Sequence, residues 1–174
     1  ALVRADIIVK GLLSYARQTP IALVEQDILV LIDESLVLTE HEFRAKHIKL
    51  AKEYPPDLPK ARVDGNQLKQ VFVNLIINGI DAMTQRGQYT IGARQIKDDE
   101  GKDLLQLSFR DTGHGIPCDK LKHIFDPFYT TKAVGNTGLG LSISKGIIDM
   151  HGGIIYAESK EGEGANFIIT LPIT

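Results

Sequence analysis

The chain has 174 residues, of which 43% are hydrophobic and 24% charged, a composition typical of a soluble globular protein with a packed core. Its formal net charge of -2 disfavours nucleic acid and other polyanions as general partners, and its single cysteine excludes a disulfide framework and a zinc site built on several cysteines. No apolar run approaches the ~20 residues that span a bilayer, and neither terminus carries a secretion or lipidation signal, so we expect a cytoplasmic protein or the cytoplasmic piece of a longer one.

The first third of the chain predicts two helices, each followed by an irregular connection. Residues 1–17 place apolar side chains at helical spacing and end before Pro20, because proline disfavours a helical conformation in the residue before it. We interpret this segment as a helix that enters from upstream, followed by a hinge. A second helix is predicted at about residues 25–42. Residues 47–53 then alternate roughly between apolar and polar side chains, and a proline-rich connector follows at residues 55–59.

A long third helix is predicted to begin after Asp64, a plausible N-cap, to run to about Thr84 and to be stopped by Gly87. A hairpin of residues 89–97 and 103–110 is predicted next, around the turn 98–101. It is followed by a short helix near 119–124, an irregular stretch at 125–138 and a helix at 139–151. A final hairpin of residues 154–159 and 165–171 is predicted around the turn 161–164. This order predicts an α+β fold, a two-layer sandwich with helices on one face of a mixed, largely antiparallel sheet.

Polar side chains form one narrow stripe along the third predicted helix, whose other positions are almost all apolar. The stripe steps by three or four residues through Gln67, Gln70, Asn74, Asn78, Asp81 and Gln85. A buried amide without a partner costs ~1–3 kcal/mol, so the stripe either faces solvent or lines a polar cavity. Short amides and one carboxylate suit oxygen donation to a hydrated metal or a ligand, whereas a solvated face usually carries Lys and Glu. The helix alone leaves both alternatives open.

Two glycine-containing loops indicate possible ligand contacts. Asp111 ends a predicted strand, where a carboxylate can accept a hydrogen bond from a buried amino group, and Gly113 and Gly115 let the backbone pass close to a flat ligand. The alternative is an ordinary tight loop. The glycines of residues 135–140 lead into a helix N-terminus, whose free N–H groups favour phosphate. The alternative there is a glycine-rich hinge, and the pattern fits neither a Rossmann fingerprint nor a P-loop.

Between these loops lies a segment with the character of a lid. Phe125 and Phe128 can pin a mobile loop to the body of the protein, and Lys132 can reach a phosphate. The alternative is a local hydrophobic anchor. The loop of residues 126–138 is long and poor in apolar side chains, which is typical of lids.

In this order and spacing, the motifs resemble those of the ATP-binding catalytic domain of sensor histidine kinases, within the superfamily of gyrase-, Hsp90-, kinase- and MutL-type ATPases. Residues 74–83 resemble its N box, 111–115 its G1 box, 125–132 its F box and 138–143 its G2 box. The resemblance implies a Bergerat-type catalytic domain at residues 20–174, and residues 1–19 resemble the end of the dimerisation and phosphoacceptor helix plus a hinge. The N box ends like that of nitrogen-regulation or C4-dicarboxylate sensor kinases.

The resemblance implies ATP and Mg²⁺ as cofactors and gives roles to individual residues. Asn78 would coordinate Mg²⁺, Asn74 would support the metal shell or the γ-phosphate, and Asp111 would accept the adenine amino group. Asn74, Asn78 and Lys132 are the implied catalytic residues, with Asn78 as the metal ligand. The implied nucleotide-binding set is Asn74, Asn78, Asp81, Asp111, Gly113, Gly115, Ile116, Phe128, Thr131, Lys132, Thr137, Gly138, Leu139, Gly140 and Leu141.

Three positions depart from the family pattern. Gly79 replaces a usual alanine, at a helix cost of ~1 kcal/mol. Asp81 stands where many members place a lysine or arginine, so the basic partner of the phosphates is not identified. Asn74 replaces the catalytic glutamate of the hydrolysing members, and fast ATP hydrolysis is therefore not expected.

The kinase reaction implied by the resemblance needs a phosphoacceptor histidine in an H-[ED]-x-x-x-P helix. His41-Glu42 begins this pattern, but Lys46 occupies the proline position, so His41 is interpreted as a surface helix residue and the acceptor is expected upstream of Ala1. His151 is expected near a helix C-terminus, where a positive charge is favourable. Cys118 is expected to pack or to be exposed rather than to act as a nucleophile.

The implied activity is transfer of the ATP γ-phosphate to a histidine of the upstream dimerisation domain and then to an aspartate of a response-regulator receiver domain. We expect no nucleic-acid partner, no membrane contact by this part of the protein and a homodimeric full-length kinase, which could be anchored in the inner membrane. The alternatives are a nucleotide-sensing or scaffolding module without kinase activity and a serine-directed kinase of the anti-sigma type.

Overall fold

The structure, a computed structural model, describes residues 21–130 and 138–173. Its elements in chain order are β1 (Val24–Gln26), α2 (Ile28–Ala45), β2 (Ile48–Glu53), β3 (Ala61–Val63), α3 (Gly65–Ala82), β4 (Gly87–Lys97), β5 (Asp103–Asp111), α4 (Cys118–Leu121), α5 (Gly140–Met150), β6 (Ile154–Ser159) and β7 (Ala165–Pro172). The helix predicted over residues 1–17 lies outside the described residues.

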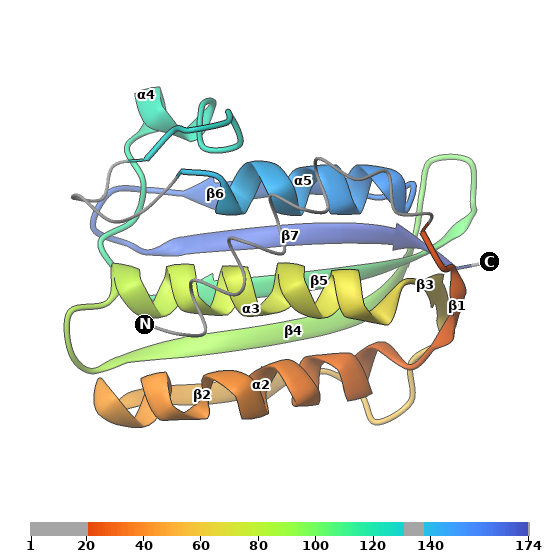
Figure 1. Ribbon diagram of the computed structural model, residues 1–174, viewed down its shortest axis with the longest axis horizontal. Helices are drawn as coiled ribbons and strands as arrows, with labels where there is room; N and C mark the ends of the chain where they lie inside the picture. Colours follow the sequence, from red (N-terminus) through yellow and green to blue (C-terminus); the bar gives the residue numbers. More distant parts are fainter. Residues whose placement is uncertain (1–20, 131–137, 174) are drawn as a thin grey trace.

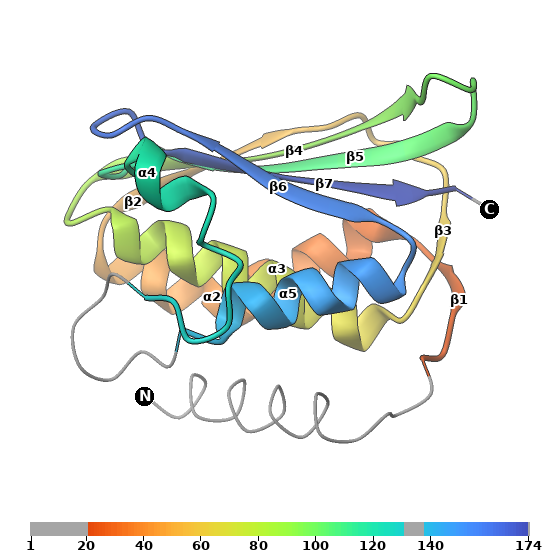
Figure 2. The same ribbon diagram turned by 90° about the horizontal axis from the view of Figure 1, so that it is seen from above.

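The elements form two layers. Strands pair in the order β2-β4-β5-β7-β6, with β2 parallel to β4 and the remaining pairs antiparallel. Helices α2, α3 and α5 lie side by side under one face of this sheet, with α3 in the middle (Figures 1 and 2). The predicted α+β sandwich with a mixed, largely antiparallel sheet is therefore confirmed. No helix within the described ranges is long and apolar enough to cross a membrane.

The core lies between α3 and the central strands. Alternate residues of β5 point towards the helices, and Phe109 stacks on Phe72 of α3 with ring centroids 5.3 Å apart. The predicted N-cap of α3 is confirmed, since the Asp64 carboxylate accepts hydrogen bonds from the backbone N–H groups of Asn66 and Gln67. The predicted end was wrong: the helix stops at Ala82, and Gly87 is already the first residue of β4.

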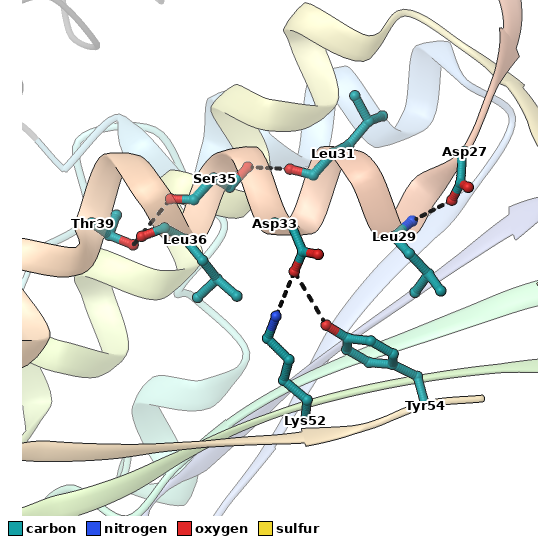
Figure 3. Close-up of polar contacts among 9 residues, drawn as sticks. All are labelled: Asp27, Leu29, Leu31, Asp33, Ser35, Leu36, Thr39, Lys52 and Tyr54. Carbon is teal, nitrogen blue, oxygen red and sulfur yellow. Dashed lines mark hydrogen bonds and ion pairs between the residues drawn. The ribbon is translucent and has the colours of Figure 1, made fainter. Parts of the chain in front are cut away.

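Helix α2 starts later than predicted because its first predicted turn is used elsewhere. Val24–Gln26 pair with Ala61–Val63 as the short ribbon β1-β3, and Asp27 then caps the helix by accepting from the backbone N–H of Leu29 at 2.9 Å. On the other side of α2, Asp33 accepts from Lys52 of the edge strand β2 at 2.6 Å (Figure 3). These contacts hold α2 between the ribbon and the sheet edge.

Both predicted hairpins are present. The β4-β5 turn is closed by the Asp98 side chain, which accepts from the backbone N–H groups of Glu100 and Lys102. The β6-β7 hairpin has the predicted pairing, with Ser159 opposite Ala165. The short helix α4 spans four residues, fewer than predicted, and α5 is one residue shorter at each end than the predicted 139–151.

Candidate functional site

The C-terminal half of α3 is where the motifs of the sequence meet. A Cβ atom added to Gly140, at the start of α5, would lie 2.5 Å from Asn74 Oδ1, and one added to Gly113 would lie 2.6 Å from the carbonyl oxygen of Ala82. A Cβ on Gly79 would lie 3.2 Å from Cβ of Asp111 at the end of β5. The strand-end carboxylate, the glycine loop after it and the glycine-rich start of α5 therefore all adjoin the same part of α3.

Asp111 is a buried carboxylate at the end of β5, with only 3% of its surface exposed. Burial is the largest influence on its pKa and raises it above 3.8, although hydrogen bonds from the backbone N–H groups of Gly113 and Ala165 act in the opposite direction. Its Oδ1 accepts from Gly113 at 2.8 Å. A buried carboxylate with a raised pKa is stabilised by a ligand that donates a hydrogen bond, which is the property that an adenine-recognising residue needs.

The ring of Tyr89 explains why position 79 is glycine. Tyr89 lies directly opposite Asp111 in the β4-β5 pair, is fully buried and packs edge-on against Phe43. Burial raises the pKa of the Tyr89 hydroxyl well above 10.0, and the charge of Asp111 raises it further. A Cβ on Gly79 would overlap Cε2 of Tyr89. The glycine therefore leaves the space that the tyrosine ring occupies beside Asp111.

We expect Gly79→Ala to destabilise the protein, although alanine has the better helix propensity. Propensity alone predicts a gain of ~1 kcal/mol. Overpacking of a filled core costs ~1–3 kcal/mol and outweighs that gain. The matched control is Gly146→Ala on α5, where an added Cβ meets nothing within 4 Å and propensity should dominate. Urea unfolding should give opposite signs for the two variants, and a stabilised Gly79→Ala protein would contradict the packing argument.

The predicted polar stripe is not one continuous surface. Its N-terminal part is partly buried, and Gln67 Oε1 and Gln70 Nε2 are buried without a hydrogen-bond partner in the part of the chain that the structure describes. Gln85 is exposed and lies beyond the end of α3, so its assignment to the stripe was wrong, because the backbone leaves the helix at Met83. Asn74, Asn78 and Asp81 remain on the helix near the other motifs.

Two amides of α3 are joined to α5 by a chain of hydrogen bonds. The amide nitrogen of Asn74 donates to the Ser144 hydroxyl at 2.9 Å, and that hydroxyl donates to the carbonyl oxygen of Gly140 at 3.0 Å. The amide nitrogen of Asn78 lies 3.5 Å from Asn74 Oδ1, the limit of a hydrogen bond. The two asparagines are therefore partly buried and oriented before any ligand arrives.

Asp81 has its basic partner on another helix. Lys46, the C-cap residue of α2, places its ammonium 3.9 Å from the Asp81 carboxylate. The same ammonium donates to the carbonyl oxygens of Ile80 at 2.8 Å and Met83 at 3.1 Å, at the negative end of α3. Lys46 is therefore the basic partner of Asp81 itself, and its hydrogen bonds hold the end of α2 against the end of α3. Sequence reasoning missed Lys46, and the acidic residue at 81 was the only signal that could have pointed to it.

The loop after β5 is held against the β6-β7 hairpin. Gly115 has a φ of +69°, and a Cβ there would overlap the carbonyl oxygen of Lys160. The backbone N–H of Ile116 donates to the Ser159 hydroxyl at 2.8 Å. The close neighbour of Gly115 is therefore the protein's own backbone, whereas a flat ligand was expected there.

The two phenylalanines of the expected lid behave differently. Phe125 packs edge-on against Phe167 of β7, with ring centroids 6.4 Å apart, as an anchor should. Phe128 is 75% exposed and has a φ of +65°, so the expectation that it pins the loop was wrong. Its backbone instead closes on Gly138, where a Cβ would lie 2.5 Å from the Phe128 carbonyl carbon. Leu139 and Leu141, next to the α5 N-terminus, are partly buried, whereas Thr131, Lys132 and Thr137 lie outside the described residues.

His151 lies at the C-terminus of α5, as expected, where it is the C-cap residue. Its Nε2 accepts from the backbone N–H of Asp64 at 2.9 Å, and its Nδ1 donates to the carbonyl oxygen of Ile147 at 2.7 Å. Each partner allows one role only, which gives Nε2 the role of acceptor and Nδ1 the role of donor. His151 ties the end of α5 to the start of α3. His41 and Cys118 are exposed, as expected for residues without a buried role.

The arrangement combines three kinds of recognition. The Asp111 carboxylate can accept from an amino group, the first turn of α5 presents backbone N–H groups to an anion, and amide oxygens on α3 can bind a cation. Together these features match a ligand that has an amino-bearing ring, phosphates and a bound divalent cation.

Comparisons with known proteins agree with this geometry. Residues 63–174 match the family of histidine kinase-, DNA gyrase B- and HSP90-like ATPases. The chain is 37% identical over 170 residues to the sensor histidine kinase ZraS of Escherichia coli O157:H7, a match that covers 98% of this chain and 36% of ZraS. The chain thus spans about a third of the length of such curated relatives.

Two solved structures are also similar to this chain. The nucleotide-free catalytic domain of the histidine kinase ThkA superposes with a TM-score of 0.76 and 33% identity, over 86% of this chain and 95% of that domain. ThkA in complex with the response regulator protein TrrA gives a TM-score of 0.80 and 33% identity, over 99% of this chain and 48% of that one.

Proposed function

The chain belongs to the histidine kinase-, DNA gyrase B- and HSP90-like ATPase family, and on this basis we propose that residues 20–174 are the catalytic ATP-binding domain of a sensor histidine kinase. The domain would bind Mg·ATP and present the γ-phosphate to a histidine of an upstream domain, from which it passes to an aspartate of a response regulator. Residues 1–19 would be the end of that upstream domain and a hinge. The observation that carries the proposal is the meeting of Asp111, Asn78 and the first turn of α5 around the same end of α3.

The residues present suit a nucleotide-bound magnesium ion. Mg²⁺ prefers oxygen ligands and is commonly held by one or two protein groups together with substrate phosphates. Asn78 would supply an amide oxygen, while the N–H groups of Gly138, Gly140 and Leu141 would bind the phosphates. When bound, the ion would neutralise phosphate charge. Asp111 would select adenine, because the group at the equivalent position of guanine is a carbonyl that a carboxylate cannot accept from.

The wider assignment follows the relatives. ThkA has been solved in complex with a response regulator, which supports a receiver domain as a partner of the full-length protein here. We also infer a homodimeric full-length kinase whose catalytic domain works in the cytoplasm. Asn74 would support the phosphates rather than activate water, since an amide cannot act as a general base.

Thermal unfolding with nucleotides is the first test of the proposal. Mg·ATP and Mg·ADP should raise the midpoint, since a ligand at 100 times its Kd adds ~2.7 kcal/mol, which is ~5–10 °C for a domain of this size. GTP and Mg²⁺ alone should leave the midpoint unchanged. An equal rise with GTP would contradict the role of Asp111, and no rise with any nucleotide would contradict the whole assignment.

Phosphotransfer then separates a kinase from a binding module. The full-length protein, or this chain mixed with the upstream domain of the same protein, is incubated with ATP labelled on the γ-phosphate. An acid-labile phosphohistidine is the expected product. Nucleotide binding without any transfer would favour a nucleotide-sensing or scaffolding module instead.

A further inference from the structure

We propose that Ser144 is a positioning residue for magnesium-dependent nucleotide binding: its hydroxyl fixes the amide of Asn74, and Asn74 in turn orients Asn78. The inference rests on the proposed function and deepens it. It adds a residue of α5 that acts through Asn74 and has no contact of its own with the nucleotide or the metal in this proposal. It also identifies a physical link between the phosphate-binding start of α5 and the metal-binding face of α3.

The hydrogen bonds of Ser144 favour one orientation of the Asn74 amide, because only that orientation keeps both of them. Ser144 is 1% exposed, and its single hydroxyl proton is used to donate to the carbonyl oxygen of Gly140 at 3.0 Å. The oxygen can therefore only accept from Asn74, whose amide nitrogen lies 2.9 Å away. An Asn74 flipped by 180° would need that proton for its own carbonyl oxygen, and the hydrogen bond from Ser144 to Gly140 would be lost. The hydroxyl thus decides which end of the amide faces Asn78.

The orientation of Asn74 sets that of Asn78. Asn74 Oδ1 faces Asn78 Nδ2 at 3.5 Å, so the amide nitrogen of Asn78 is directed back along α3 and its oxygen is directed away from Asn74. That oxygen is the atom proposed as the magnesium ligand. Gly140 contributes by having no side chain, because a Cβ there would lie 2.5 Å from Asn74 Oδ1. One hydroxyl therefore connects the first turn of α5 to the metal ligand.

A purely structural role for Ser144 makes a different prediction. Ser35 on α2 is buried and donates to the carbonyl oxygen of Leu31 at 2.7 Å, the same bond to the residue four positions earlier that Ser144 makes to Gly140 (Figure 3). What Ser144 has in addition is the amide of Asn74. Ser35→Ala is therefore the matched control, because it removes the same helix bond from α2, which lies on the other side of α3 from α5 (Figures 1 and 2).

The first experiment measures nucleotide affinity with and without the metal. Ser144→Ala should weaken Mg·ATP binding about tenfold, because one oriented contact is lost. The Kd of ADP measured without magnesium, in the presence of a chelator, should stay within about twofold of the parent value. Ser35→Ala should change neither value. Ser144→Thr keeps the hydroxyl and should restore most of the Mg·ATP affinity. Equal losses for Ser144→Ala in both conditions would overturn the positioning role, and so would equal behaviour of Ser144→Ala and Ser35→Ala.

The second experiment needs no ligand. A double-mutant cycle of Ser144→Ala and Asn74→Ala in urea should be strongly non-additive, because each single variant breaks the same bond, whereas Ser35→Ala and Asn74→Ala should add. Additivity in the first cycle would overturn the inference. A parent that binds no adenine nucleotide would instead overturn the proposed function and the inference together. A parent that binds Mg·ATP, combined with a Ser144→Ala variant of unchanged magnesium dependence, would overturn the inference alone.

Discussion

Asp111→Asn is expected to weaken the binding of adenine nucleotides by about tenfold to a hundredfold, the range for a lost hydrogen bond to a charged group. The structure gives the reason. One carboxylate oxygen accepts from the backbone N–H of Gly113 at 2.8 Å, so an asparagine keeps its carbonyl oxygen there. Its NH₂ group then takes the place of the second oxygen, and two donors would meet where adenine presents its amino group. The same NH₂ can donate to the guanine carbonyl, so the preference for ATP over GTP should fall.

The ligand-free variant should be as stable as the parent at neutral pH, or more stable. Burial raises the pKa of Asp111 above its unfolded value of 3.8, so the stability that this group contributes is fully present below pH 3.8 and is lost as the pH rises through the folded pKa. Ionised Asp111 therefore opposes folding at pH 7, and the neutral amide does not. The stability difference between variant and parent should accordingly grow from about pH 4 and level off once Asp111 is ionised in the folded protein as well.

The matched control is Asp103→Asn at the other end of the same strand. Asp103 is partly exposed to solvent and pairs with Lys97 at 3.0 Å, and hydrogen bonding to Lys97 lowers its pKa. Its contribution is present above the unfolded pKa and is lost as the pH falls, so this variant should lose a little stability and no nucleotide affinity. Titration calorimetry gives the affinities and urea unfolding the stabilities. An Asp111→Asn protein that keeps its ATP affinity would show that the adenine assignment is wrong.

Asn78→Ala is expected to remove the magnesium dependence of ATP binding. The alanine has no oxygen to offer the ion, and removing a metal ligand should cost more than the tenfold to hundredfold of a supporting residue, so we expect at least about a hundredfold loss of Mg·ATP affinity. Binding of ADP in chelator should change little, because Asp111 and the first turn of α5 are untouched. Calorimetry at several magnesium concentrations measures both effects.

Two further variants make this result specific. Asn66→Ala removes an asparagine from an exposed position in the first turn of the same helix and should leave nucleotide binding unchanged. Asn78→Asp keeps an oxygen at the position and should retain magnesium-dependent binding. If Asn78→Ala and the parent respond equally to magnesium, the ion is held by other groups and the ligand assignment fails.

Much of the architecture could be predicted because it depends on neighbours in the sequence. The apolar periodicity of α3, its cap at Asp64 and the turn after Asp98 each involve residues only a few positions apart. The motifs that carry the family resemblance lie around α3 in the structure, with Gly113 beside Ala82 and Gly140 beside Asn74. The errors in this part were at element ends. The third helix was predicted to run to about Thr84 and to be stopped by Gly87, but it ends at Ala82 and Gly87 already belongs to β4, because the start of the next strand outweighs the helix propensity of the last one or two residues.

The sequence by itself determined which residues could form helices, strands and turns, and which chemical groups were available for a site. The tertiary structure alone decided how those groups are paired. The bond between Asn74 and Ser144 spans 70 positions and that between Asp64 and His151 spans 87. The pairing of Asp81 with Lys46 and the fit of Tyr89 over Gly79 likewise join separate elements. Such contacts leave no local signature, because propensities and caps act within one or two turns, whereas a long-range partner is fixed only by the packing of helices and strands against one another.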